Sequence, residues 1–135
     1  MVSVIVTTKN ESGHIRACLE SIKRQTYADI EILVIDNGSK DKTKTIAKAY
    51  TPHVYDAGPE RSAQRNFGAK KARGEYIVCL DADMILTPPV IGQCVTNATS
   101  YGYLGIVIPE KSFGTGFWAA CKTLERSLYE GVAWI

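Results

Sequence analysis

Short apolar runs alternate along this chain with segments whose apolar residues recur every three or four positions. The runs from Val2 to Thr8 and from Ile30 to Asp36 are rich in β-branched residues without regular polar alternation, which is typical of strands covered on both faces. Between them, residues 15–22 place apolar side chains at the spacing of one helical face. Asn10 or Ser12 is expected to cap this helix, because both side chains accept backbone hydrogen bonds.

The same alternation continues along the rest of the chain. Further strands are predicted at residues 53–57, 75–80 and 103–110. Helices are predicted around residues 46–50, over 60–73, after Pro88 and over 113–129. Ser39 or Asp41 is expected to cap the helix around 46–50, and Gly74 is expected to close the helix over 60–73.

Strands that alternate with helices predict an α/β fold, with a mostly parallel sheet covered by helices on both faces. In such sheets, ligands bind outside the carboxyl ends of the strands. Polar residues follow four of the predicted strands, at residues 7–11, 36–39, 56–59 and 81–83. We therefore expect these four segments to line one edge of the sheet.

The composition fits one soluble domain over residues 1–135, with 45% hydrophobic residues, 22% charged residues and a formal net charge of +2. No run approaches the ~18 apolar residues of a membrane span, and no leader pattern opens the chain, so a cytoplasmic location is expected. The small basic excess is spread out, which gives no support to nucleic-acid binding. The four cysteines form no C-x-x-C pair and are expected to be buried free thiols.

Two carboxylates one residue apart, Asp81 and Asp83, follow the predicted strand over 75–80. Ionised carboxylates repel each other and are costly to desolvate, so a cation should balance them. If the strand continues through Ala82, both side chains point the same way and can share one ion. Mg²⁺ and Mn²⁺ are often held by one or two carboxylates together with substrate phosphates. The alternative is a turn or a helix cap before Pro88.

Other polar groups near this edge have two interpretations each. Asp36 can accept hydrogen bonds from a ribose or a base, or it can satisfy backbone donors in the following turn. Arg61 and Arg65 lie four residues apart on one helical face, where Arg65 can reach a phosphate or stack on a base. A solvated helix surface is the alternative for both arginines.

The motifs VSVIVTTKNE, ILVIDNGSKDKT and RSAQRNFGAKKARGEYIVCLDAD, with the spacing between them, resemble the N-terminal half of family 2 glycosyltransferases. This inverting family has the GT-A fold, a three-layer α/β/α arrangement. The resemblance covers almost the whole chain. It implies a nucleotide-diphospho-sugar donor, a divalent cation (Mn²⁺ or Mg²⁺), and a saccharide, lipid-linked or protein acceptor. The residues do not select among UDP, GDP and dTDP, or identify the sugar.

The resemblance also assigns roles to matching positions. Residues that would border the nucleotide are Thr7, Thr8, Asn10 and Glu11. Asp36 would meet the base or ribose, and Arg65 would lie beside the nucleobase. Asp81 would contact the ribose or the metal region, and Asp83 would be the direct metal ligand of a D-x-D motif.

The chain departs from the family at three places. Gln64 stands where relatives have alanine, and Asn37 stands where many have a second aspartate; either change could alter base selectivity. The third departure is the acceptor-binding region with its general-base aspartate, for which the chain has no obvious equivalent before Ile135. Glu110 is the one well-placed acid left, and it is a weak candidate for the base.

Two functions therefore stay open: an inverting glycosyltransferase, or a truncated module that binds a nucleotide sugar without turnover. Apolar residues of segment 113–135 have little sequence left to cover them, so self-association through this segment is expected. Two other classes fit poorly. A phosphoacceptor receiver domain needs an acidic pair, and a dinucleotide-binding oxidoreductase needs G-x-G-x-x-G, where this chain has TTKNE.

Overall fold

The structure is a computed structural model that describes residues 1–111, 120–121 and 124. It divides into two compact units, residues 1–102 and residues 103–135. All the strands found among the described residues belong to the first unit. Most of the predicted helix over 113–129 and of the predicted self-association segment lies outside the described residues, and the single domain over 1–135 stays a prediction. Among the described residues, no helix is long and apolar enough to cross a bilayer.

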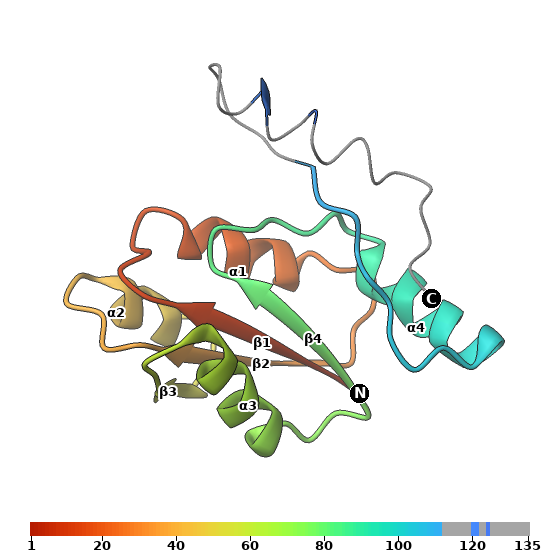
Figure 1. Ribbon diagram of the computed structural model, residues 1–135, viewed down its shortest axis with the longest axis horizontal. Coiled ribbons are helices and arrows are strands. Elements are labelled where there is room, and N and C mark those ends of the chain that lie inside the picture. Colours follow the sequence, from red (N-terminus) through yellow and green to blue (C-terminus); the bar gives the residue numbers. More distant parts are fainter. Residues whose placement is uncertain (112–119, 122–123, 125–135) are drawn as a thin grey trace. The chain divides into compact units, whose positions relative to one another are not determined.

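Four parallel strands form the sheet of the first unit, in the order β3-β2-β1-β4 (Figure 1). They are β1 (Val2–Thr8), β2 (Ile30–Asp36), β3 (Val54–Asp56) and β4 (Tyr76–Asp81). All seven residues of β1 are buried, because this strand has a neighbour on each side and helices on both faces. The four strands agree with the sequence-based prediction to within one residue at each end.

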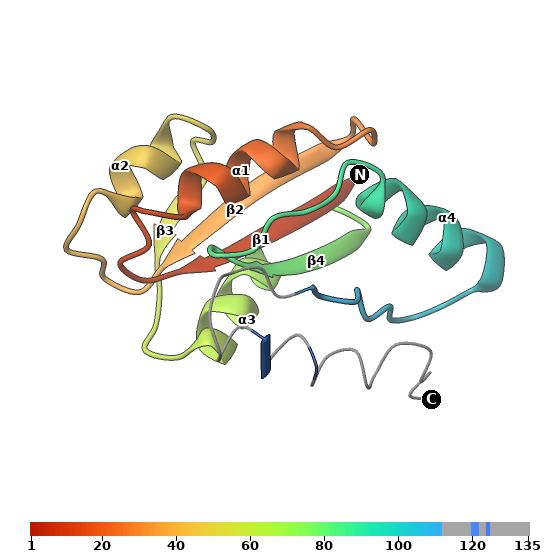
Figure 2. The ribbon, with the colours of Figure 1, turned by 90° about the horizontal axis from the view of Figure 1, so that it is seen from above.

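Helices cover both faces of this sheet (Figure 2). One face carries α1 (Ile15–Lys23), α2 (Thr43–Lys48) and α4 (Val90–Tyr101), and the other carries α3 (Arg61–Lys71). Because strand side chains alternate, β1 sends Val4 and Val6 to the first face and Ile5 to the second. The predicted three-layer α/β/α architecture with a parallel sheet is confirmed.

The fifth strand predicted at residues 103–110 is not formed. Residues 103–111 adopt neither helix nor strand. Leu104 and Val107, which suggested a strand, are exposed. A strand is stable only when it pairs with a neighbour and buries a face, so an apolar composition by itself is not sufficient.

Three predicted helix boundaries are also wrong, including the start of α2, where the N-cap is Lys42 instead of Ser39 or Asp41. The N-cap of α1 is His14, which makes no side-chain capping hydrogen bond, and the Asn10 side chain instead accepts a hydrogen bond from the Lys40 N–H at 2.9 Å. The helix α3 ends at Lys71, before Gly74. Gly74 is needed for a different reason, because a Cβ atom there would lie 2.6 Å from the backbone nitrogen of Ser3.

The cysteines are free thiols, but only one of them is buried. Cys18 is buried and Cys94 is half-buried, whereas Cys79 and Cys121 are exposed. Cys79 lies on β4, which is an edge strand, and Ile77 on the same strand is also exposed. The prediction of burial is therefore wrong for Cys79 and Cys121, since an apolar sequence neighbourhood does not ensure cover from another element.

An ionic cluster around the buried Glu31 lies at the opposite edge of the sheet, where the strands begin. Glu31 accepts hydrogen bonds from the Ser3 hydroxyl at 2.5 Å and the Arg73 N–H at 2.6 Å, and forms an ion pair with the Arg73 guanidinium at 3.0 Å. Burial raises the pKa of Glu31, but these hydrogen bonds and the Arg73 charge together lower it from 4.5 to about 2. The ionised carboxylate therefore stabilises the junction of β1, β2 and the segment entering β4.

We expect Glu31→Gln to lower the free energy of unfolding at pH 7 by about 1–3 kcal/mol, because charge-assisted hydrogen bonds are lost. Since folding depresses the pKa of Glu31, its contribution is fully present above about pH 4.5 and is lost as the pH falls toward about 2. The stability difference between wild type and variant should shrink over this range in thermal denaturation. Glu20→Gln is the control, because that carboxylate is 40% exposed in its pair with Arg24. A difference that does not change with pH would contradict this account of Glu31.

Candidate functional site

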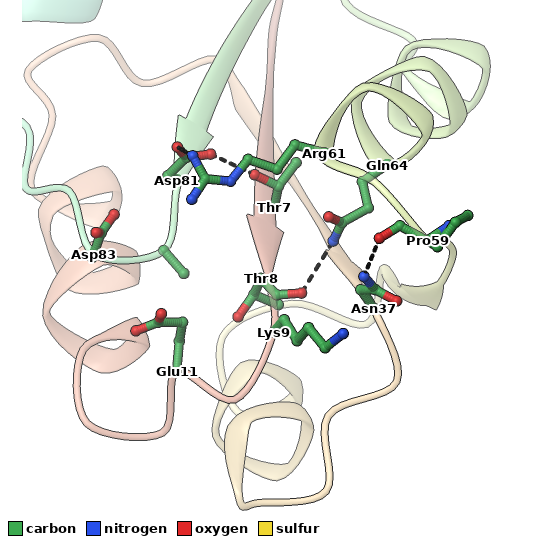
Figure 3. A pocket seen from close by; sticks show the side chains of 11 residues that line it. Thr7, Thr8, Lys9, Glu11, Asn37, Pro59, Arg61, Gln64, Asp81 and Asp83 are labelled. Carbon is green, nitrogen blue, oxygen red and sulfur yellow. Dashed lines mark hydrogen bonds and ion pairs between the residues drawn. The ribbon is translucent and has the colours of Figure 1, made fainter.

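A pocket of about 300 Å³ lies at the carboxyl edge of the sheet (Figure 3). The strand register places Thr7 of β1 opposite Asp81 of β4, and Thr8 of β1 opposite Asp36 of β2. All four predicted polar segments contribute to the walls, together with the first turns of α3. The lining residues are Thr7, Thr8, Lys9, Glu11, Asn37, Pro59, Arg61, Gln64, Asp81, Ala82 and Asp83.

Asp81 is held by three neighbours. Its Oδ1 atom accepts a hydrogen bond from the Thr7 hydroxyl at 2.7 Å and lies 3.2 Å from Nη2 of Arg65. Its Oδ2 atom lies 3.1 Å from Nη1 of Arg61. The side chain of Asp81 is only 14% exposed, so these contacts offset the cost of burying its charge. Asp81 is therefore a paired carboxylate that joins β1 and β4 to α3.

Asp83 has a different environment. The strand β4 ends at Asp81, and the buried Ala82 donates its N–H to the Thr7 carbonyl at 3.1 Å. Asp83 lies in the turn that follows and is exposed, and no described residue forms a hydrogen bond or an ion pair with its side chain. The expected continuation of the strand through Ala82 is not observed. Both carboxylates nevertheless line the same pocket, one paired and one unpaired.

The donor set fits a hard cation that a ligand helps to hold. Among the described residues, no group of three or more histidine, cysteine or acidic side chains could hold a metal ion. Burial, with the nearby charges of Asp83 and Asp81, raises the pKa of the Cys18 thiol to about 12, so this thiol stays neutral. Asp83 and Glu11 are the other two acidic residues that line the pocket; Oε2 of Glu11 lies 2.8 Å from Nδ1 of His14, and Figure 3 shows Glu11 extending toward the segment that carries Asp83. Mg²⁺ and Mn²⁺ accept such sites when substrate phosphates supply further oxygens.

Gln64 explains one departure from the family sequence. This side chain is buried, and its Nε2 atom donates to the Thr8 carbonyl at 3.0 Å and to the Ile35 carbonyl at 2.6 Å. Alanine at this position could not link the ends of β1 and β2. The hydroxyl of the adjacent Thr8 is buried and has no hydrogen-bond partner among the described residues. Buried hydroxyls rarely lack a partner, so Thr8 is a candidate contact for a bound molecule.

Asn37 explains the other departure. Its amide Nδ2 donates a short hydrogen bond to the carbonyl of Pro59, which a carboxylate could not do (Figure 3). A Cβ atom on Gly58 would lie 2.4 Å from the Asn37 side-chain oxygen, so a larger residue there would make the Asn37 side chain shift. The loop after β2 is thereby attached to the loop that enters α3, and both border the pocket.

Three of the predicted nucleotide-binding residues do not line the pocket. Asp36 is fully buried, and its carboxylate accepts hydrogen bonds from the Ser39 N–H and hydroxyl, which is the turn alternative. Asn10 connects two loops by accepting from the Lys40 N–H and donating its own N–H to Ser39. Arg65 is paired with Asp81. Their roles in nucleotide binding stay predictions.

Several pocket residues were not assigned a role from the sequence, among them Lys9, Arg61 and Gln64. Lys9 lies within the polar segment 7–11, so its position after β1 was a usable signal. Arg61 and Gln64 lie three residues apart on α3, the spacing of one helical face. Glu110, the weak candidate for the base, belongs to the second unit, and its catalytic role stays a prediction.

The family is shown by the sequence. The chain matches the description Glycosyl transferase family 2 over residues 3–130, and it belongs to this family. It is 33% identical over 124 residues to the uncharacterized glycosyltransferase EpsJ of Bacillus subtilis, covering 87% of this chain and 34% of EpsJ. It is 36% identical over 103 residues to the uncharacterized glycosyltransferase YibD of Escherichia coli, covering 72% of this chain and 30% of YibD. The chain thus spans about a third of the length of these relatives.

Solved structures agree with the fold. S. aureus TarS residues 1–349, crystallised with UDP-GlcNAc, matches 84% of this chain with a TM-score of 0.67 and 24% identity, and 38% of that chain is covered. The mannosyltransferase PcManGT from Pyrobaculum calidifontis, in complex with GDP-Man and Mn²⁺, matches 62% of this chain with a TM-score of 0.56 and 28% identity, and 28% of that chain is covered. The sheet and its helices are therefore those of a GT-A glycosyltransferase.

We expect Asp36→Ala to weaken uridine binding about tenfold, with or without Mn²⁺, if the buried carboxylate contacts the base or ribose. Ser39→Ala is the matched variant, because it removes the hydroxyl that donates a hydrogen bond to Asp36 and keeps the Asp36 carboxylate. Calorimetry should then show a much smaller loss for Ser39→Ala. Equal losses in both variants would assign Asp36 to the turn alone, and a loss that requires Mn²⁺ would place it in the metal site.

Proposed function

We propose that this chain forms the donor-binding part of an inverting glycosyltransferase, which transfers a sugar from a nucleotide-diphosphate donor with a divalent cation. One observation carries the proposal: Asp83, whose carboxylate has no partner among the described residues, lines the same pocket as the arginine-paired Asp81 at the carboxyl edge of a parallel sheet. This edge is where such sheets bind ligands. The UDP-GlcNAc complex of TarS and the complex of PcManGT with GDP-Man and Mn²⁺ support the same class of donor.

The charges of the site support a cation together with the donor. Three cationic side chains line the pocket or pair with its wall, namely Lys9, Arg61 and Arg65, and three carboxylates also line it, namely Glu11, Asp81 and Asp83. Their formal charges cancel. A nucleotide sugar brings about two negative charges on its diphosphate, and one divalent cation compensates them. The net formal charge of the site therefore stays at zero when donor and cation bind together.

The residues of the chain would divide the work of transfer among them. Asp83 would hold the cation at the diphosphate, while Arg61 and Lys9 would face the phosphates from α3 and the loop after β1. When bound, the metal acts as a Lewis acid that stabilises negative charge on the departing diphosphate. Thr7 and Arg65 keep Asp81 fixed, so the wall of the site is rigid before the donor arrives.

Inversion requires the acceptor hydroxyl to attack the sugar carbon from the side opposite the leaving diphosphate. A base must accept the proton of that hydroxyl from within hydrogen-bond reach. Asp81 is not assigned the role of this base, because its carboxylate is held by Thr7, Arg61 and Arg65. Glu110 remains the candidate, and Glu110→Gln would abolish acceptor-dependent transfer if it is the base.

We expect Asp83→Asn to weaken UDP binding at least tenfold when Mn²⁺ is present and to leave binding unchanged in EDTA. The variant keeps the side-chain shape and removes the charge that would hold the cation. Calorimetry with UDP, GDP and dTDP first selects the best nucleotide and then compares the variants. Asp29→Asn is the control, because that exposed carboxylate pairs with the N-terminal amine at the start of the sheet. An unchanged, metal-dependent affinity in Asp83→Asn would refute Asp83 as the ligand.

A further inference from the structure

The two arginines on Asp81 are held very differently. The side chain of Arg65 is 43% exposed and contacts Oδ1, the oxygen that also accepts the Thr7 hydroxyl. The side chain of Arg61 is 74% exposed and contacts only Oδ2, at 3.1 Å. Arg61 also lines the pocket, as Figure 3 shows, whereas Arg65 is not among the lining residues. Arg65 thus supports Asp81 from outside the pocket lining, and Arg61 is the more easily displaced partner.

An exposed ion pair with a single contact is easily exchanged. Such pairs contribute about 0–1 kcal/mol, whereas a guanidinium can bind phosphate oxygens through two parallel hydrogen bonds. Arg61 is also the first residue of α3, a helix that begins without a side-chain cap. The uncapped N–H groups of a helix start favour an anion at the same place. An arriving diphosphate therefore competes well with Asp81 for Arg61.

Resting on the proposed function, we propose that Arg61 is a diphosphate-binding residue that Asp81 holds at the pocket until the donor arrives. On binding, the Arg61 guanidinium moves from Oδ2 of Asp81 to the phosphate oxygens. Asp81 keeps Arg65 and Thr7 on Oδ1, and its Oδ2 atom becomes available to the cation region. Arg61 would in this way couple donor binding to cation binding, because Oδ2 of Asp81 would be free to help hold a cation only after the phosphates had taken the arginine.

This exchange predicts opposite effects of Arg61→Gln on the two ligands. UDP binding in EDTA should weaken about tenfold, the value of one charge-assisted hydrogen bond, while uridine binding is unchanged. Binding of Mn²⁺ without nucleotide should tighten by up to about fivefold, because the carboxylate of Asp81 loses a competing cation. Calorimetry with UDP, uridine and Mn²⁺ alone on the full chain measures all three. A purely structural role for Arg61 would not tighten Mn²⁺ binding.

Arg24→Gln is the matched control. Its guanidinium is 73% exposed and lies 3.2 Å from Glu20 on α1, so the variant removes the same charge and a similar ion pair. All three affinities should match wild type in this variant, and Arg61→Lys should keep most of the UDP affinity in EDTA.

The outcomes separate this inference from the proposed function. If wild type binds UDP and Arg61→Gln binds it equally well, or loses UDP and uridine together, the phosphate role of Arg61 is refuted. If UDP binding weakens but Mn²⁺ binding does not tighten, the exchange with Asp81 is refuted. A wild-type chain that binds no nucleotide at all would overturn the proposed function and this inference with it.

Discussion

Parallel pairing of β1 with both β2 and β4 decides where the polar groups of this protein lie. The shared direction brings the carboxyl ends of the strands to one edge, and the register places Thr7 opposite Asp81 and Thr8 opposite Asp36. The loops that follow these strands therefore lie together at this edge. They are tied to one another by hydrogen bonds such as that from the Glu11 N–H to the Thr43 hydroxyl at 2.8 Å. The pocket is a consequence of the sheet.

Close packing of α3 on the sheet sets the charge of this edge. Gly68 lets the helix approach β1, since a Cβ atom there would lie 2.5 Å from Cγ2 of Ile5. The first turns of α3 consequently reach the strand ends, where Arg61 and Arg65 pair with Asp81. With Asp81 compensated, Asp83 is the acid of the D-x-D pair left without a partner among the described residues. A packing constraint thus gives two neighbouring aspartates different surroundings: Asp81 is paired with two arginines, and Asp83 is exposed in the pocket.

The strands, the layers and the convergence of four polar segments could be predicted from the sequence, because β-branched runs and helical spacing are properties of the chain alone. The pairing of Asp81 with two arginines could not, since it depends on how closely α3 packs. The burial of Asp36 under Ser39 and the role of Gln64 between two strand ends depend equally on tertiary contacts. The strand predicted at residues 103–110 is not formed for a related reason. The sequence pattern of a strand does not reveal whether a partner strand is present to pair with it.

Mn²⁺-induced broadening of backbone amide resonances tests the central claim most directly, because it locates the cation on the chain without depending on turnover. With UDP present, the account predicts broadening centred on Ala82, Asp83 and Glu11, and little effect on Glu31 and Gly74 at the other edge of the sheet. Without UDP, the same Mn²⁺ concentration should broaden these resonances much less, since the phosphates supply part of the coordination. Broadening that is centred elsewhere, or that does not depend on UDP, would contradict the account.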